Sequence, residues 1–232
     1  MPLHPERLRA VTLDLDDTLW PVAPVIARAE IALQTWLGEY APSVALHVDR
    51  VGMLALRAQV ERDLAHAVHD LTAWRKETLR RALLQAGCDP ALAEPAFDVF
   101  YAERNRVEFY ADALPALERL ALRWPIVVVS NGNADPGRID GLAQLLHASV
   151  SAREVGVAKP DRRIFDVACV RAGCRSDEVL HVGDDWKLDV MGAHRAGLRT
   201  AWLRRLDRAR GDDHEPDWEG ADLLALCDAL GA

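Results

Sequence analysis

The chain has 232 residues, half of them hydrophobic, and a formal net charge of −8. A chain of this length can bury a sizeable core, either as one large domain or as a core domain with a smaller insert. The negative charge argues against a nucleic-acid-binding surface, which needs a basic face, and no apolar stretch approaches the roughly 20 residues of a membrane span.

The cysteines and the first residues of the chain bear on its location. The four cysteines form no CxxC pair and no Cys/His metal spacing, so we expect free thiols in a reducing compartment. No charged-then-apolar leader opens the chain. Together these features predict a cytoplasmic protein.

The first part of the chain combines one strand with a long helical segment. The leucine-rich and β-branched stretch over residues 8–15 predicts a buried strand. The next clear strand begins only at Ile126. Between them, apolar residues recur at helical spacing over 26–37, 71–82 and 97–107. The sequence therefore predicts an all-helical insert after the first strand.

From Ile126 onward, predicted strands and helices alternate. Such alternation implies a mainly parallel sheet with helices on both faces, so we expect an α/β fold with a Rossmann-like, doubly wound parallel sheet. The expected core covers 1–20 and 111–232, and the expected helical insert covers 21–110. The predicted strands are 126–130, 148–151, 179–183 and 199–203, and the predicted helices are 141–148, 162–173 and 189–197.

Polar residues follow the predicted strands. In a doubly wound sheet, ligands bind outside the carboxyl ends of the strands. Several separate segments therefore deliver carboxylates, a hydroxyl and an ammonium group to one edge of the sheet. These residues are Asp14, Asp16, Asp17 and Thr18 after the first strand, Ser130, Asn131 and Gly132 after the second, Lys159 in a later loop, and Asp184 and Asp185 after a further strand.

Clustered carboxylates without histidine or cysteine suit a hard cation. Mg²⁺ usually binds one or two carboxylates together with substrate phosphate oxygens. A cation among Asp14, Asp16 and Asp184 would relieve their mutual repulsion and neutralise a phosphoryl group. An ionised aspartate can attack phosphorus to give an aspartyl-phosphate, and a second carboxylate two residues on can act as general acid and base.

The other polar groups suit the phosphate itself. The Ser130 hydroxyl and the backbone N–H groups around Asn131 and Gly132 can donate hydrogen bonds to phosphate oxygens. The Lys159 ammonium can offset their charge. The sequence therefore predicts a binding site for a small phosphorylated metabolite.

Four segments, DLDDT, VVVSNGN, VAKPD and GDDWKLD, resemble the four motifs of the haloacid-dehalogenase-like hydrolase superfamily in order and spacing. The resemblance covers nearly the whole chain, and the helical insert is similar to that family's helical cap. Members that cleave carbon–halogen bonds lack the second acid of the first motif. Its presence as Asp16 favours a phosphatase.

The resemblance implies a role for each matched residue. It makes Asp14 the nucleophile, Asp16 the acid and base, and Ser130 a phosphate ligand. It also makes Lys159 the charge-neutralising lysine and Asp184 a ligand of Mg²⁺, the implied cofactor.

Four further residues near these motifs have expected roles. The resemblance assigns Asp185 to the water molecules of the metal and Asp189 to the orientation of Lys159. An acid at position 189 would also stabilise the first turn of the predicted helix. Asp17 is expected to be structural, and Thr18 is expected to bond the local backbone.

Two other functions share part of this residue set. A phospho-acceptor switch domain also combines acids, a hydroxyl and a lysine at a sheet edge, but its acceptor lies on a later strand and no long cap follows its first strand. A phosphomutase of the same superfamily shares every core residue and returns the phosphate to a bound sugar. A phosphatase of another small metabolite is a further alternative.

A closer resemblance concerns the substrate. Segments such as DLDDTLWPVAPVIARAE and HDLTAWR are similar to the bacterial phosphatases of riboflavin synthesis, which act on 5-amino-6-(5-phospho-D-ribitylamino)uracil and on flavin mononucleotide (FMN). We expect Trp74 and Arg75 to contact the uracil or flavin ring. The alternative is that Trp74 packs inside the cap with Leu71 and Thr78. No nucleic-acid or membrane partner is expected, and the chain is expected to be a monomer or a homodimer.

Overall fold

The computed structural model describes residues 3–206, 210–211 and 214–232 of the chain. The chain folds into two compact units. One unit, formed by Met1–Val22 and Glu108–Ala232, contains all strands of the described residues and is called the sheet unit below. The other, formed by Ala23–Val107, is helical and is called the helical unit.

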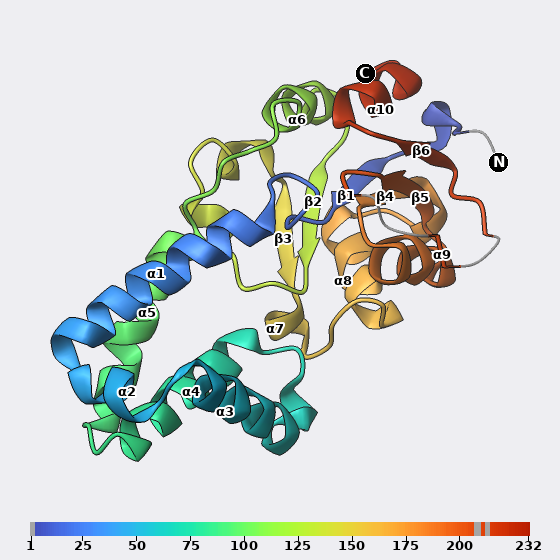
Figure 1. Cartoon of the computed structure of the whole chain (residues 1–232). Coiled ribbons are helices and arrows are strands. Elements are labelled where there is room, and N and C mark those ends of the chain that lie inside the picture. Colours follow the sequence, from blue (N-terminus) through green and yellow to red (C-terminus); the bar gives the residue numbers. More distant parts are fainter. Residues whose placement is uncertain (1–2, 207–209, 212–213) are drawn as a thin grey trace. The chain divides into compact units, whose positions relative to one another are not determined.

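A six-stranded sheet forms the centre of the sheet unit (Figure 1). Its strands stand in the order β3-β2-β1-β4-β5-β6, and every neighbouring pair is parallel. Strands β1, β2 and β4 are buried along their whole length, as expected for apolar strands covered on both faces. The strands are β1 (Ala10–Leu13), β2 (Ile126–Ser130), β3 (Ala148–Ser151), β4 (Val179–Gly183), β5 (Arg199–Leu203) and β6 (Trp218–Gly220).

Helices flank this sheet, which confirms the predicted α/β, doubly wound fold with an inserted helical unit (Figure 1). Helix α8 shows how the sequence sets helix ends: the Asp161 carboxylate accepts a hydrogen bond from the Arg163 N–H, and Gly173 ends the helix at φ 66°. Helices α8 and α9 join residues of β1, β2 and β4 in one apolar cluster, while α6 packs against α10. The helices of this unit are α6 (Ala113–Ala121), α7 (Ala152–Val155), α8 (Arg162–Ala172), α9 (Met191–Ala196) and α10 (Leu223–Leu230).

Two elements of the sheet unit differ from the sequence prediction. The predicted helix over 141–148 is wrong, because only a short 3₁₀ turn, η5 (Ala143–Leu145), forms there. The His147 N–H donates to the Ile126 carbonyl at 2.8 Å. The chain therefore enters the sheet at this point, which leaves too few residues for a longer helix. Strand β6 was not predicted, since its three residues at the sheet edge are too few to show a strand period.

The helical unit packs its helices around one apolar core. Helix α1 contributes Ala29, Leu33 and Leu37, whose four-residue spacing places them on one face. Helix α4 buries Leu83, whereas Leu71 at its start is 40% exposed. No helix in the described part of the chain is long and apolar enough to cross a membrane. The helices are α1 (Val22–Tyr40), α2 (Pro42–His47), α3 (Arg50–Asp63), α4 (Leu71–Gln85) and α5 (Ala93–Arg104).

Replacing Leu83 by alanine tests this core. Leu83 is fully buried, whereas its neighbour Leu84 is 49% exposed. Truncation in a packed core removes apolar contacts and leaves a cavity, so we expect Leu83→Ala to lower the free energy of unfolding by about 2–5 kcal/mol. The control, Leu84→Ala, should change it by less than about 0.5 kcal/mol. Chemical denaturation of the full chain measures both, and equal losses would contradict this core.

Candidate active site

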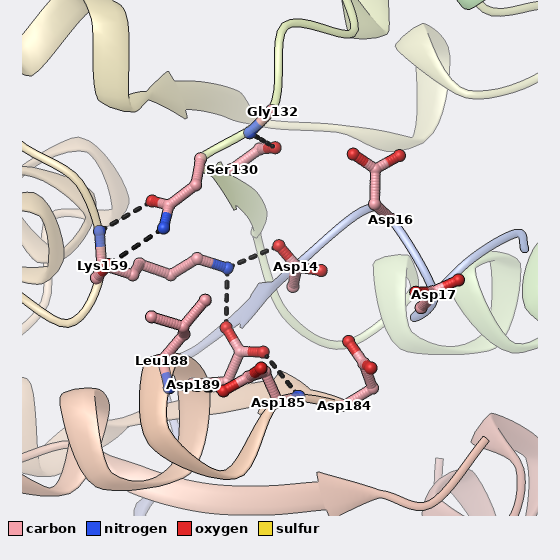
Figure 2. A pocket seen from close by; sticks show the side chains of 11 residues that line it. Asp14, Asp16, Asp17, Ser130, Gly132, Lys159, Asp184, Asp185, Leu188 and Asp189 are labelled. Carbon is pink, nitrogen blue, oxygen red and sulfur yellow. Dashed lines mark hydrogen bonds and ion pairs between the residues drawn. The ribbon is translucent and has the colours of Figure 1, made fainter. Parts of the chain in front are cut away.

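A pocket of about 240 Å³ opens at the carboxyl edge of the sheet (Figure 2). It collects the polar residues that follow β1, β2 and β4 together with Lys159 from the loop before α8. Apart from Thr18, all the polar residues expected at this edge of the sheet therefore line one pocket. The lining residues are Asp14, Asp16, Asp17, Ser130, Asn131, Gly132, Lys159, Asp184, Asp185, Leu188 and Asp189.

The strand order explains why these segments meet. From β1 the chain passes to β2 and β3 on one side and to β4, β5 and β6 on the other, so the order of the strands reverses beside β1. Ligand sites of doubly wound sheets lie at such a point. The Asp14 N–H donates to the Val182 carbonyl at 3.0 Å, which sets Asp14 beside the end of β4 and thus near Asp184.

Lys159 is the buried centre of the pocket. Its ammonium lies 2.5 Å from Asp14 Oδ1 and 2.6 Å from Asp189 Oδ1, and its side chain is only 2% exposed. The Asn131 amide holds the Lys159 backbone: Oδ1 accepts from the Lys159 N–H at 2.7 Å, and Nδ2 donates to the Lys159 carbonyl at 2.9 Å. The Asn131 side chain thus positions Lys159. Of the Asn131 groups, the backbone N–H is therefore the one that can donate to a phosphate oxygen.

The hydroxyl predicted to bind phosphate lies in the same pocket. Ser130, at the end of β2, accepts a hydrogen bond on its Oγ from the Gly132 N–H at 2.9 Å. Because a hydroxyl also carries a proton to donate, Ser130 keeps a donor for a ligand while Gly132 fixes its orientation. The Gly132 N–H itself is already used by this turn.

A single π-helical turn, η7 (Trp186–Val190), directs Asp189 toward Lys159. The Asp185 carboxylate accepts from the Lys187 and Leu188 N–H groups and so begins this turn. The Asp185 N–H in return donates to Asp189 Oδ2 at 3.1 Å. A Cβ at Gly183 would lie 2.3 Å from Asp189 Cγ, so only glycine lets this carboxylate approach the strand end.

His181 is a site residue that the sequence reasoning missed. It lies on β4, is 1% exposed, and places Nε2 3.2 Å from Asp189 Oδ1 and Nδ1 2.9 Å from Thr12 Oγ1. Burial lowers the pKa of His181 despite the nearby Asp189 carboxylate, so the ring is neutral at pH 7. The available signal was a polar residue within an otherwise apolar strand.

Thr18 bonds the local backbone through its N–H, which donates to the Leu15 carbonyl at 3.3 Å. Its buried hydroxyl, in contrast, lies 3.4 Å from Asp14 Oδ2 and 3.5 Å from Asp184 Oδ1. A hydroxyl has one proton and donates to one of these carboxylates at a time. Asp17 is structural, as expected: it takes a left-handed φ of 58° and its carboxylate accepts from the Val22 N–H.

The pocket carries more negative than positive charge. Oxygens of Asp14, Asp184 and Asp189 lie within 4.8 Å of one another, and all three residues are buried. Burial opposes ionisation of Asp189, but Lys159 and His181 hold its pKa below the ordinary value. Burial raises the pKa of Asp14 to about 7, with Lys159 acting in the opposite direction. One ammonium therefore does not offset the buried carboxylates.

This donor set fits a hard divalent cation. Carboxylate oxygens are the ligands that Mg²⁺ prefers. Asp189 already accepts from Lys159 and from the Asp185 N–H, which leaves Asp14 and Asp184 as the better candidates. The carboxylate of Asp16 is not part of this cluster, and its Oδ1 accepts from the Trp20 indole at 2.9 Å.

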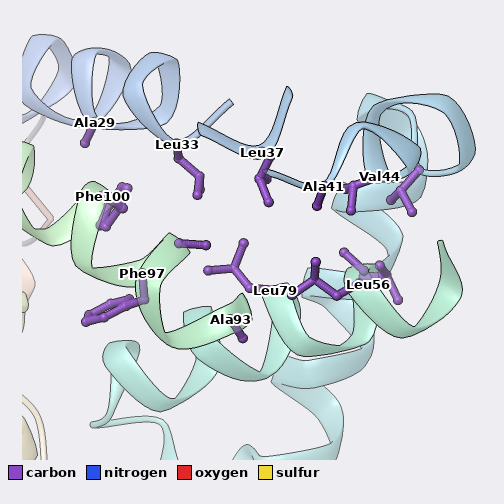
Figure 3. Close-up of a cluster of buried hydrophobic side chains, with 14 residues drawn as sticks. Ala29, Leu33, Leu37, Ala41, Val44, Leu56, Leu79, Ala93, Phe97 and Phe100 are labelled. Carbon is purple, nitrogen blue, oxygen red and sulfur yellow. The ribbon is translucent and has the colours of Figure 1, made fainter. Parts of the chain in front are cut away.

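Trp74 and Arg75, the predicted ring-binding residues, belong to the helical unit. The Trp74 indole donates to the Leu64 carbonyl at 3.3 Å. The Arg75 guanidinium lies 2.8 Å from Glu30 Oε1 and 3.6 Å from the centre of the Phe100 ring, which is part of the apolar core in Figure 3. Both side chains therefore have packing roles within their own unit.

Comparison with known proteins agrees with this geometry. Residues 8–197 match the family model described as haloacid dehalogenase-like hydrolase. The chain is 34% identical to 5-amino-6-(5-phospho-D-ribitylamino)uracil phosphatase YigB of Escherichia coli, over 85% of this chain and 84% of that protein. It is 30% identical to the phosphoserine phosphatase of Thermus thermophilus, over 96% of this chain and 100% of that protein.

A solved structure points to the same family. The 2-haloacid dehalogenase from Pseudomonas syringae pv. Tomato DC3000 superposes with a TM-score of 0.91 and 36% identity, over 97% of this chain and 98% of that one. Phosphatases and a dehalogenase are thus similar to this chain along most of its length. Since the family model covers most of the chain and the acids of its pocket, the protein belongs to the haloacid dehalogenase-like hydrolase family.

Proposed function

We propose that the protein is a Mg²⁺-dependent phosphomonoester hydrolase that works through an aspartyl-phosphate intermediate. The observation that carries this proposal is the presence of Asp14 and Asp16 in one pocket with the buried Lys159 ammonium. A carboxylate nucleophile needs a proton donor for the leaving alkoxide, and Asp16 supplies a second acid in the same loop. The resemblance that makes Asp16 the mark of a phosphatase supports the same choice over a dehalogenase.

Asp14 and Asp184 would hold the cation through their carboxylates. When bound, Mg²⁺ neutralises charge on the phosphoryl group and on these acids. The cation would also complete the charge balance that Lys159 leaves incomplete.

The chain's own groups divide the remaining work. Lys159 keeps one oxygen of Asp14 in place. The Ser130 hydroxyl and the backbone N–H of Asn131, whose side chain is bound to Lys159, bind phosphate oxygens. Asp14 attacks phosphorus as Asp16 gives its proton to the leaving alkoxide. Asp16 then takes a proton from the water that attacks the aspartyl-phosphate, which releases phosphate and restores the Asp14 carboxylate and the protonated Asp16.

For the substrate we propose 5-amino-6-(5-phospho-D-ribitylamino)uracil and FMN, with the helical unit, expected over 21–110, acting as the cap. The 34% identity with the Escherichia coli uracil phosphatase supports this choice. Phosphoserine or another small phosphorylated metabolite is the alternative, which the Thermus thermophilus relative supports. Ring contacts by Trp74 and Arg75 stay a prediction, as does a cytoplasmic location.

A second candidate function is hydrolytic dehalogenation. The structural similarity to the Pseudomonas syringae 2-haloacid dehalogenase favours it. Halide release from 2-haloacids, measured beside phosphate release from a panel of phosphorylated metabolites, separates the two activities. Phosphate release without halide release supports the phosphatase, and the reverse result would exclude it.

Metal dependence is the first prediction for this reaction. Because the buried carboxylates outnumber the ammonium, hydrolysis of an aryl phosphate should stop in a chelator and return when Mg²⁺ is added. Phosphate release measures both states. Undiminished turnover in chelator would exclude the metal role of Asp14 and Asp184.

The two acids of the first motif should respond differently to substitution. Asp14→Asn removes the nucleophile, so turnover and phosphoenzyme should both disappear. Asp16→Asn removes the proton donor and the base, so both half-reactions should slow, by about 10²–10⁴-fold. Quenched-flow trapping of the phosphoenzyme measures the two steps. Normal activity in the Asp14 variant would end the covalent mechanism.

The excess of buried carboxylates over the Lys159 ammonium should also affect the free energy of unfolding of the metal-free protein. The raised pKa of Asp14, about 7, means that the folded state holds this proton more tightly than the unfolded chain. The resulting stabilisation is complete below the unfolded pKa and is lost as pH rises through 7. Relative to wild type, Asp14→Asn should therefore gain free energy of unfolding between about pH 4 and pH 7.

Urea denaturation in chelator at several pH values measures this difference. Mg²⁺ should then stabilise the wild type more than Asp14→Asn, because binding to the folded state raises its stability. A difference between the two proteins that stays constant with pH would contradict the imbalance.

A further inference from the structure

The Asp16 carboxylate accepts a hydrogen bond from a residue that does not line the pocket. The indole N–H of Trp20 donates to Asp16 Oδ1 at 2.9 Å. Trp20 is 0% exposed, although the carboxylate that it contacts lines the pocket. In Figure 2 the Asp16 side chain turns away from the ion pair between Asp14 and Lys159.

The donor is held in place from several directions. The Trp20 ring packs edge-to-face against Phe109, with ring centres 5.6 Å apart and planes at 82°. The Trp20 carbonyl accepts from the Asp17 N–H at 2.8 Å, and Asp16 and Trp20 form an isolated parallel bridge. A buried ring with these contacts cannot follow the carboxylate, so the carboxylate must orient toward the ring.

An indole N–H can only donate, and it carries no proton that a carboxylate at pH 7 could remove. It therefore binds Asp16 Oδ1 whether the acid is ionised or protonated, and it takes no part in proton transfer. By fixing Oδ1 it sets the carboxyl plane and thus the place of Oδ2. Proton transfer needs donor and acceptor within about 2.6–3.2 Å, so this orientation bears directly on the rate.

We propose that Trp20 is a positioning residue that orients Asp16 for proton transfer to the leaving group. The inference rests on the proposed function, in which Asp16 protonates the alkoxide. In that step the O–H bond of Asp16 breaks, its proton joins the leaving oxygen, and the phosphorus–oxygen bond breaks with its electron pair on that oxygen. Trp20 keeps its N–H throughout.

The test uses two substrates that differ in their need for an acid. The leaving group of an alkyl phosphate is a strongly basic alkoxide, which needs the proton. The leaving group of p-nitrophenyl phosphate is a stable phenolate, which does not. Trp20→Phe keeps a buried ring and removes the donor. It should lower kcat for the alkyl ester by about tenfold or more and for the aryl ester by less than about threefold, because general acid catalysis is worth about 10²–10⁴-fold.

Trp124→Phe is the matched control. The Trp124 indole is also buried in the sheet unit, donates to the Leu8 carbonyl at 3.0 Å, and does not line the pocket. Its loss should affect both substrates equally. Equal losses on both substrates in Trp20→Phe would show that this tryptophan only supports the fold, and would overturn the proposal.

A spectroscopic readout covers the case in which Trp20→Phe fails to fold. With ¹⁵N-labelled indoles, Asp16→Asn should move the Trp20 N–H resonance and leave that of Trp124 in place. An unmoved Trp20 resonance would also overturn the proposal. If the wild type releases no phosphate from either ester, the proposed function itself is wrong. If the wild type is active and Trp20→Phe loses kcat equally on both esters, only the positioning role is wrong.

Discussion

The buried ammonium of Lys159 is the interaction on which the rest of the pocket depends. It lies between the carboxylates of Asp14 and Asp189, where water is nearly excluded. Removal of this ammonium would leave two buried carboxylates without a charged partner. A buried carboxylate without such a partner strongly destabilises the folded state. Asn131 fixes the Lys159 backbone, and Gly183 leaves room for Asp189. The positions of Asn131 and Gly183 are thus related to the burial of one charge.

That ammonium offsets only part of the negative charge of the buried carboxylates. Lys159 and His181 hold the pKa of Asp189 below its ordinary value, whereas burial raises the pKa of Asp14 to about 7. A bound cation would favour the ionised form of this carboxyl group, which is the form that the proposed reaction needs. Shifted pKa values of this kind cluster at functional sites of proteins, which supports the proposed role of the pocket.

The comparison with a dehalogenase shows where fold and function separate. The overall fold is shared with the Pseudomonas syringae enzyme at a TM-score of 0.91, so the sheet cannot decide which bond is cleaved. Under the proposed function, a side chain of the pocket makes the difference. Asp16 is the residue on which the proposed phosphatase depends, and Trp20 holds its carboxylate in one orientation.

The sequence by itself determined the fold class, the helical insert and the edge of the sheet where the acids gather. Apolar periodicity is a local property, and the strand ends are marked by polar residues such as Asp14, Ser130 and Asp184. Short elements could not be predicted in this way. Strand β6 has too few residues to show a period, and the segment over 141–148 is apolar but does not form a helix.

Only the tertiary structure decided which side chains share a proton or a charge. Thr18 between two acids, His181 beside Asp189, and the Trp20 indole on Asp16 follow from the packing of segments against one another. Lys159 and Asp14 are 145 positions apart in the chain and 2.5 Å apart in the fold. Hydrogen bonds depend on distances of tenths of an ångström, which the packed core sets and which no sequence period encodes.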